Sequence, residues 1–196
     1  MKKTAFDIVA LASSAGGLKA VETVLSKMPE DFEVPIVIVQ HLDPRHQSLM
    51  AKIVSRHTPL RVKEAQDGET LEGGIVYIAA PNNHLLVNTD HTLSLSKSEL
   101  VHFLRPSADL LFESVAASYK DRAIAVVLTG TGNDGAMGVT AIKKVGGTVI
   151  AQDEATSDFF GMPGGAIQTG NVDFILPLDE IASALVSLVR GEEMGE

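Results

Sequence analysis

The sequence predicts an α/β fold: a three-layer α/β/α, doubly wound, mostly parallel and Rossmann-like sheet with a small antiparallel hairpin. Continuous apolar runs at 8–11 and 123–128 are typical of strands buried on both faces of a parallel sheet. Helical patterns alternate with such runs, which indicates helices on both faces. Because 196 residues are ordinary for one domain, we expect a single domain over 1–196, with a core from about 6 to 189 and a tail from 190 to 196.

Each element is expected from its spacing of apolar residues and from the turn residues that flank it. Apolar runs predict strands at 8–11, 34–40, 62–65, 75–79, 123–128, 148–151 and 172–176. Two alternating runs, 85–87 and 93–95, predict the hairpin. Helical spacing predicts helices at about 18–28, 47–57, 108–119 (capped by Ser107), 136–145, 166–169 (led in by residues 161–165) and 178–189.

The turn between the first strand and the first helix carries a candidate nucleophile. Ser14 lies there within Ala12-x-Ser14-x-Gly16, which resembles the nucleophile elbow G-x-S-x-G with alanine in place of the first glycine. Small residues suit such a turn, because a larger side chain would block its packing against the helix. Unpaired N–H groups at the helix N-terminus can hold an anion. The alternative is that Ser14 only caps the helix.

Three polar residues of different chemistry follow three of the expected strands. Ser14 follows the first strand, His41 follows the second, and Asp134 lies in the loop after 123–128. Ligands of open parallel sheets bind outside the carboxyl ends of the strands, so these side chains can converge in one crevice. A serine hydroxyl needs a base, histidine suits that role near neutral pH, and a carboxylate orients the imidazole. The residues therefore predict a Ser-His-Asp triad for acyl transfer.

The third of these loops also has a second interpretation. Gly130-Thr-Gly132-Asn-Asp-Gly135 fits G-x-G-x-x-G between a strand and a helix. Asp153 lies about 20 residues further on, where a ribose-binding acid is expected. This pattern is typical of a dinucleotide-binding protein, although an aspartate within the motif would face the phosphates unfavourably. Both interpretations stay open at this point.

Composition excludes several classes of protein. The formal net charge is −9 without a basic tract, which disfavours nucleic-acid binding. The absence of cysteine excludes disulfides and thiol nucleophiles and fits a reducing cytoplasm. No run reaches 18 apolar residues, so we expect no membrane insertion. His41, Asp43 and His46 are close in sequence, but their loop gives no reason to converge on a metal, so we expect no metal site. Acyl transfer by a Ser-His-Asp triad needs no metal or organic cofactor, so that interpretation predicts none.

Five segments of the chain together carry a resemblance to a known family. They are Ala12-Ser-Ser-Ala-Gly-Gly17, Val39-Gln-His-Leu42, Arg105-Pro-Ser-Ala-Asp-Leu-Leu-Phe112, Leu128-Thr-Gly-Thr-Gly-Asn-Asp-Gly135 and Phe160-Gly-Met-Pro163. In this order they resemble the catalytic domain of the bacterial chemotaxis protein-glutamate methylesterases. Lys63-Glu-Ala-Gln-Asp-Gly68 and Ile78-Ala-Ala-Pro81 are similar to that family as well, and the resemblance covers about 7–189.

The resemblance implies a function and a role for each site residue. It implies hydrolysis of glutamyl methyl esters in the cytoplasmic helical region of methyl-accepting chemoreceptors, with release of methanol, and deamidation of certain receptor glutamines. Ser14 would be the nucleophile, His41 the general base and then acid, and Asp134 the orienting carboxylate. The backbone N–H groups of Ala15 and Thr131 would hold the oxyanion. A catalytically idle module that binds receptors or signalling proteins is the alternative.

The chain also departs from that family. Ala15 stands where the family often has threonine, and Thr131 where it often has methionine, but a backbone N–H tolerates either side chain. Gly164-Gly165 replace a stretch that is often charged in relatives. Family members usually carry an N-terminal receiver domain, whereas the catalytic segment begins here at residue 6, so we expect no internal regulation by receiver phosphorylation. Candidate receptor contacts are Arg45, Arg56 and Arg105, the last of which suits a structural role equally well.

Overall fold

A computed structural model of the chain describes residues 4–41, 49–101 and 104–192. The strands are β1 (Ile8–Ser13), β2 (Ile36–Gln40), β3 (Arg61–Glu64), β4 (Ile75–Ile78), β5 (His84–Val87), β6 (Leu93–Ser96), β7 (Ala123–Val127), β8 (Thr148–Gln152) and β9 (Phe174–Leu176). The α-helices are α1 (Gly17–Ser26), α2 (Met50–Val54), α3 (Ala108–Tyr119), α4 (Ala136–Lys144), α5 (Gly161–Gln168) and α6 (Ile181–Arg190). Two short 3₁₀ helices, η1 (Lys120–Arg122) and η2 (Leu178–Glu180), precede β7 and α6.

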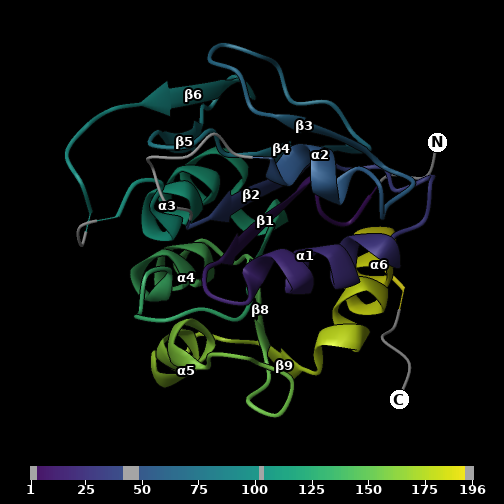
Figure 1. The fold of residues 1–196 in the computed structure, drawn as a ribbon, viewed down its shortest axis with the longest axis vertical. Coiled ribbons are helices and arrows are strands. Elements are labelled where there is room, and N and C mark those ends of the chain that lie inside the picture. The colour runs from purple at the N-terminus through teal and green to yellow at the C-terminus, as the bar shows by residue number, and fades with distance from the viewer. Residues whose placement is uncertain (1–3, 42–48, 102–103, 193–196) are drawn as a thin grey trace.

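Seven strands form one sheet in the order β3-β4-β2-β1-β7-β8-β9, and every neighbouring pair in it is parallel. The hairpin β5–β6 forms a separate antiparallel sheet. Helices cover both faces of the large sheet (Figure 1). The predicted three-layer, doubly wound fold with its hairpin is therefore confirmed, and the large sheet is wholly parallel rather than mostly so.

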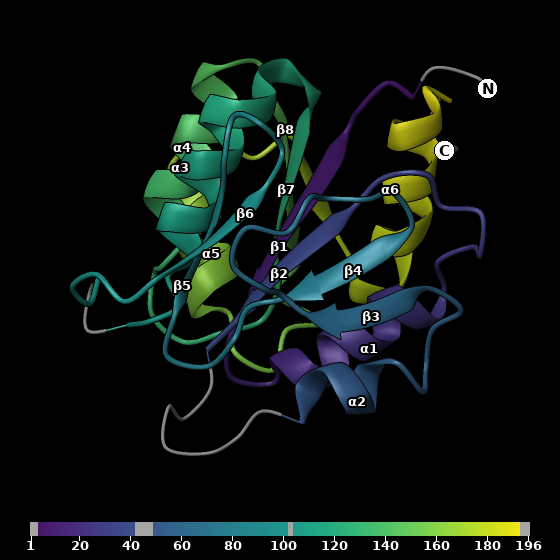
Figure 2. The same ribbon diagram turned by 90° about the horizontal axis from the view of Figure 1, so that it is seen from above.

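The two faces of the sheet belong to two separate hydrophobic clusters. Side chains along β1 point alternately to the two faces of the sheet. Ile8, Ala10 and Ala12 belong to one cluster, together with buried residues of α3, α4, α5 and the hairpin. Val9 and Leu11 belong to the other, with α1, α2 and α6. Figure 2 shows these two groups of helices on opposite sides of the strands. Burial on both faces is the reason the strands are continuously apolar in sequence.

The order of the strands locates the crevice of the fold. On one side of β1 the next strands are β2 and β4, and on the other side they are β7 and β8. Such a reversal between neighbouring strands opens a crevice at their carboxyl ends, which here are the ends of β1 and β7. The loops after these strands carry Ser14 and Asp134, so the topology brings two of the candidate residues to one edge.

Helix boundaries differ from the sequence-based prediction at both α5 and α6. α5 begins at Gly161 instead of 166, with Pro163 in its first turn, where a missing N–H costs no helical hydrogen bond. Gly161 also packs closely, since an added Cβ would lie 2.9 Å from Gly132 N. α6 spans Ile181–Arg190 instead of 178–189, and it is capped by Gly191 in the left-handed conformation at φ 66°.

The helix predicted over 47–57 is shorter in the structure, where α2 spans Met50–Val54. Residues 47 and 48 lie outside the described residues, as do Asp43, Arg45 and His46. Among the helices of the described residues, none is both long enough and apolar enough to span a bilayer.

Candidate active site

Ser14 lies at the centre of the carboxyl edge of the sheet. The parallel ladders continue beyond the strands, since His41 N donates to Ser13 O at 3.1 Å and Ser14 N donates to Thr129 O at 3.0 Å. Ser13 is paired with Gln40 in the register, so Ser14 and His41 occupy the next pair of ladder positions. Because side chains alternate along a strand, these two positions share the face that is covered by α3 and α4.

The two neighbouring serines differ in what their hydroxyls do. Ser13 is fully buried, and its Oγ donates to Gln40 Oε1 at 2.5 Å. Ser14 is partly exposed, and its Oγ forms no hydrogen bond with any residue that the structure describes, His41 included. The N-cap of α1 is Gly16, which makes no side-chain cap, so the alternative role of Ser14 as a helix cap is wrong. The Ser14 hydroxyl is thus available for chemistry.

Gln40 joins the ends of β1 and β2, a role that the sequence interpretation missed. Its Nε2 donates to Ser14 O at 2.7 Å and to His41 O at 3.1 Å, while Oε1 accepts from Ser13. Gly17 makes room for this amide, because an added Cβ would lie 2.1 Å from Gln40 Oε1. A polar residue that ends an apolar strand directly before His41 was the available signal.

His41 and Asp134 are in direct contact across the edge of the sheet. His41 Nε2 lies 2.8 Å from Asp134 Oδ2, and the two side chains are 9% and 1% exposed. With the carboxylate ionised, Nε2 carries the shared proton and Nδ1 is the nitrogen left to act on a hydroxyl. The structure therefore brings the predicted base, His41, into contact with the predicted acid, Asp134. Ser14 lies opposite His41 in the continued strand register.

The carboxylate of Asp134 is seated on the N-terminus of α3. Its Oδ1 accepts from Ser107 Oγ and from Asp109 N, each at 3.0 Å, and its Oδ2 accepts from Ala108 N at 2.6 Å. Burial would raise the pKa of Asp134, but hydrogen bonds from His41, Ala108 and Asp109 outweigh burial and hold that pKa below its ordinary value. Asp134 is therefore an ionised, oriented acceptor for the imidazole.

The turns that carry Ala15 and Thr131 meet beside Ser14. Thr129 Oγ1 donates to Ala15 O at 3.0 Å, which ties the two turns together. Gly130 packs on Ser14, since an added Cβ would lie 2.8 Å from Ser14 Cβ. Among the described residues, the N–H groups of Ala15 and Thr131 have no acceptor. An oxyanion requires unpaired donors near the attacking oxygen, so these two N–H groups stay the candidate donors.

The contacts of the glycine-rich loop disfavour the dinucleotide interpretation. The loop does connect β7 to α4, as the motif requires. However, Gly135 N and Gly138 N, which would face a phosphate, donate instead to Asp109 Oδ1 at 2.9 and 2.8 Å. The expected ribose acid, Asp153, accepts from Thr156 N and Oγ1 in its own turn. The chain thus fills with its own carboxylate the place at α4 that a nucleotide phosphate would take.

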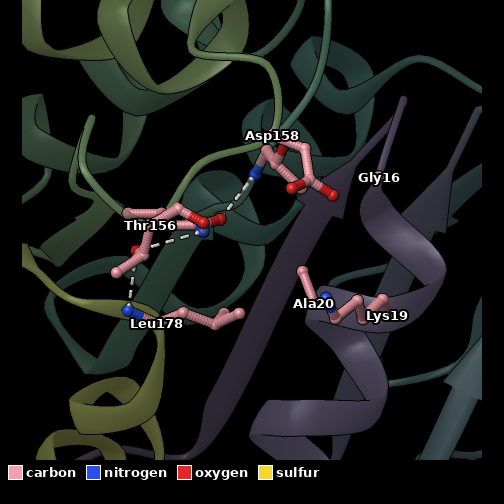
Figure 3. A pocket seen from close by; sticks show the side chains of 8 residues that line it. Gly16, Lys19, Ala20, Thr156, Asp158 and Leu178 are labelled. Atoms are coloured by element: carbon pink, nitrogen blue, oxygen red, sulfur yellow. Dashed lines mark hydrogen bonds between the residues drawn. The ribbon is translucent and has the colours of Figure 1, made fainter.

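A small cavity of about 40 Å³ lies next to the turn at Gly16, between α1 and the loop that follows β8 (Figure 3). Its lining residues are Gly16, Lys19, Ala20, Thr129, Gln152, Thr156, Asp158 and Leu178. Their polar groups bond to one another, as where Gln152 Oε1 accepts from Thr129 N and Thr156 Oγ1 accepts from Leu178 N. A space of this size suits a water molecule rather than a substrate side chain.

The chain is similar to known proteins in sequence and in fold. A family model described as CheB methylesterase matches residues 9–185. A Rhizobium meliloti "Protein-glutamate methylesterase/protein-glutamine glutaminase of group 3 operon" is 41% identical over 194 residues, which are 99% of this chain and 55% of that protein. A Leptospira interrogans protein whose name gives the same two activities is 40% identical over 93% of this chain and 95% of its own length. The crystal structure of the Thermotoga maritima CheB methylesterase catalytic domain is similar at a TM-score of 0.91 and 38% identity, covering 94% of this chain and 99% of that one.

Proposed function

This chain belongs to the CheB methylesterase family, and we propose that it removes methyl esters from glutamyl residues of chemoreceptors through Ser14, His41 and Asp134. The observation that supports this assignment of residues is the 2.8 Å contact between His41 Nε2 and Asp134 Oδ2, next to Ser14 in the strand register. Relatives are also named protein-glutamine glutaminase, and an amide carbonyl can be attacked by the same groups. Deamidation of receptor glutamines is therefore part of the proposal.

In the first half of the reaction, Ser14 Oγ attacks the ester carbonyl carbon while His41 Nδ1 takes the hydroxyl proton. Asp134 holds Nε2 and stabilises the imidazolium without taking the proton. The carbonyl oxygen becomes an oxyanion that accepts from the N–H groups of Ala15 and Thr131. Loss of one such donor costs about 2.7 to 4 kcal/mol in other enzymes of this type.

In the second half, the tetrahedral intermediate collapses. The bond between the carbonyl carbon and the methoxy oxygen breaks, and methanol leaves with the proton that His41 holds. Water then attacks the acyl-enzyme with His41 again as the base, and the Ser14 oxygen departs with that proton. The products are the free serine and a glutamic acid side chain, which releases its proton to water and becomes a carboxylate. From a glutamine substrate ammonia leaves in place of methanol.

We also propose the partner, the extent and the location of this activity. The partner is the cytoplasmic helical region of methyl-accepting chemoreceptors, which places the protein in the cytoplasm, as its lack of cysteine suits. Residues 6–189 form one catalytic domain, because the single large sheet takes strands from β1 through to β9.

Among the candidate receptor contacts, the arginines differ in their surroundings. The guanidinium of Arg105 donates to Asn82 Oδ1 at 2.9 Å and to the carbonyls of Lys97 and Ser98 at 3.0 and 2.8 Å. These contacts favour a structural role for Arg105. Arg56 is exposed just beyond α2 and remains a candidate for receptor binding.

Methanol release from a methylated receptor tests the proposed function. Wild type is expected to release methanol, and Ser14→Ala to lose activity by several orders of magnitude, because nucleophile and base act as a unit. Ser26→Ala is a matched control, since its hydroxyl lies on the exposed face of α1 and bonds only to Thr23 O at 2.9 Å. Wild type that binds the receptor but releases no methanol would establish the binding-module alternative instead.

A further inference from the structure

Asp109 is a buried carboxylate that the proposed mechanism does not use. It lies in the first turn of α3 and is 4% exposed. Its Oδ1 accepts from Gly135 N at 2.9 Å and from Gly138 N at 2.8 Å, at the N-terminus of α4. Gly135 follows Asp134 directly, so Asp109 binds the backbone beside the acid of the site.

Asp109 and Asp134 each cap the helix that belongs to the other. Asp134 precedes α4, yet its carboxylate accepts from Ala108 N and Asp109 N in α3. Asp109 lies in α3, yet its carboxylate accepts from the first turn of α4. Each carboxylate thus occupies the positive end of a helix dipole. The backbone of α3 thus binds the Asp134 carboxylate, and the Asp109 side chain binds the backbone that follows Asp134.

We propose that Asp109 is a positioning residue for the reaction, which fixes the loop of Asp134 so that Asp134 Oδ2 stays against His41 Nε2. This inference rests on the proposed function. Asp109 can reach the backbone of α4 because α3 packs closely on α4. An added Cβ on Gly138 would lie 2.6 Å from Phe112 Cβ and 3.1 Å from Asp109 Cα. The close packing therefore fixes the distance between the Asp109 side chain and the backbone at the start of α4.

The acceptor oxygen of Asp109, rather than its charge, is what this site uses. Burial raises the pKa of Asp109, and the nearby charge of Asp134 adds to this, against hydrogen bonds from Gly138 and Gly135. A negative charge is thus less favoured here than in water, whereas an acceptor oxygen at this point pairs two buried N–H groups. Asparagine has an acceptor oxygen at the same distance from the backbone as aspartate. Glutamate keeps the carboxylate but places it one methylene further from the backbone, and alanine has neither group.

The test compares Asp109→Asn, Asp109→Glu and Asp109→Ala in methanol release. The alanine and glutamate variants are expected to lose about tenfold or more in kcat with KM nearly unchanged, because a small displacement of a catalytic group has that effect. The asparagine variant is expected to stay within about threefold of wild type. The proton shared by His41 and Asp134 gives a second readout: its downfield NMR signal should persist in Asp109→Asn and disappear in the other two variants.

Two control variants separate positioning from general stability. Glu113→Ala removes an exposed carboxylate from the same helix and should change neither readout. Val115→Ala removes fully buried methyl groups from α3 without touching either aspartate, and it should lower stability while keeping kcat and the downfield signal. If Asp109→Ala does not fold, the comparison of Asp109→Asn with Asp109→Glu decides.

Equal kcat in Asp109→Asn and Asp109→Glu would overturn the inference, as would a loss of kcat and signal in Val115→Ala as large as in Asp109→Ala. Failure of the proposed function is distinguishable from these results. In that case wild type releases no methanol, while the NMR signal still reports whether Asp109 holds Asp134 against His41.

Discussion

His41 Nε2 lies 2.8 Å from Asp134 Oδ2, and the two residues are separated by 93 positions in the chain. Three more hydrogen bonds from the N-terminus of α3 reach the same carboxylate, from Ser107, Ala108 and Asp109. The acid is therefore oriented by a helix before any substrate binds, and only the serine hydroxyl has still to form its hydrogen bond. Catalytic contacts of this kind commonly tighten when substrate is present.

If Asp134 acts as proposed, Asp134→Asn is expected to lower kcat by about 10³-fold or more, as the same change does in known Ser-His-Asp enzymes. The amide keeps the shape of the side chain but turns an acceptor of the imidazole proton into a group that can present a donor. Methanol release at saturating receptor measures the effect. A loss smaller than tenfold would show that His41 does not depend on this carboxylate.

The lowered pKa of Asp134 predicts how stability depends on pH. Its ionised form is favoured by folding, so its contribution is fully present above the ordinary aspartate pKa of about 3.9 and is lost as pH falls through the lower folded value. The difference in unfolding free energy between wild type and Asp134→Asn should therefore shrink as pH falls below about 4. Urea unfolding of both proteins between pH 3 and 7 checks this, and a difference that widens in acid would contradict it.

Gly130→Ala should impair the reaction through contact with the nucleophile. The new Cβ would lie 2.4 Å from Met162 Sδ and 2.8 Å from Ser14 Cβ. Met162 can rotate away, but Ser14 is held by its backbone, so we expect kcat to fall about tenfold or more. The double variant with Met162→Ala is the control. It relieves only the sulfur contact, so recovery of full activity in it would show that Ser14 had not been displaced.

The contacts of His84 predict that its Nε2 carries a proton and its Nδ1 does not. It is fully buried, Ser107 N donates to its Nδ1 at 3.2 Å, and its Nε2 lies 3.0 Å from Glu99 O. Since a backbone N–H cannot donate to a protonated nitrogen, only this tautomer satisfies both contacts. Long-range ¹⁵N NMR correlations distinguish the tautomers, with exposed His91 as the internal reference. A proton found on Nδ1 would contradict the hydrogen bond that holds Ser107 behind Asp134.

Local patterns predicted most of the secondary structure, and the exceptions have physical causes. Residues 161–165 contain three glycines and a proline, which is poor helix chemistry, yet α5 begins at Gly161. Tertiary packing explains this, because Met162, Pro163 and Gly164 are buried and Gly161 must approach the loop at Gly132. Gln40 was missed as a site residue because its partners, Ser13 and Ser14, come from another strand.

The order of apolar strands and helices was readable from the chain alone, because buried parallel strands and amphipathic helices leave local periodic patterns. So were the positions of Ser14, His41 and the loop of Asp134 at strand ends. The sequence could not show which helix Asp134 caps, or that Asp109 returns the same contact to α4. Those pairings join groups far apart in the chain, and they exist only once the packing of α3 on α4 has set the distance between two helix ends.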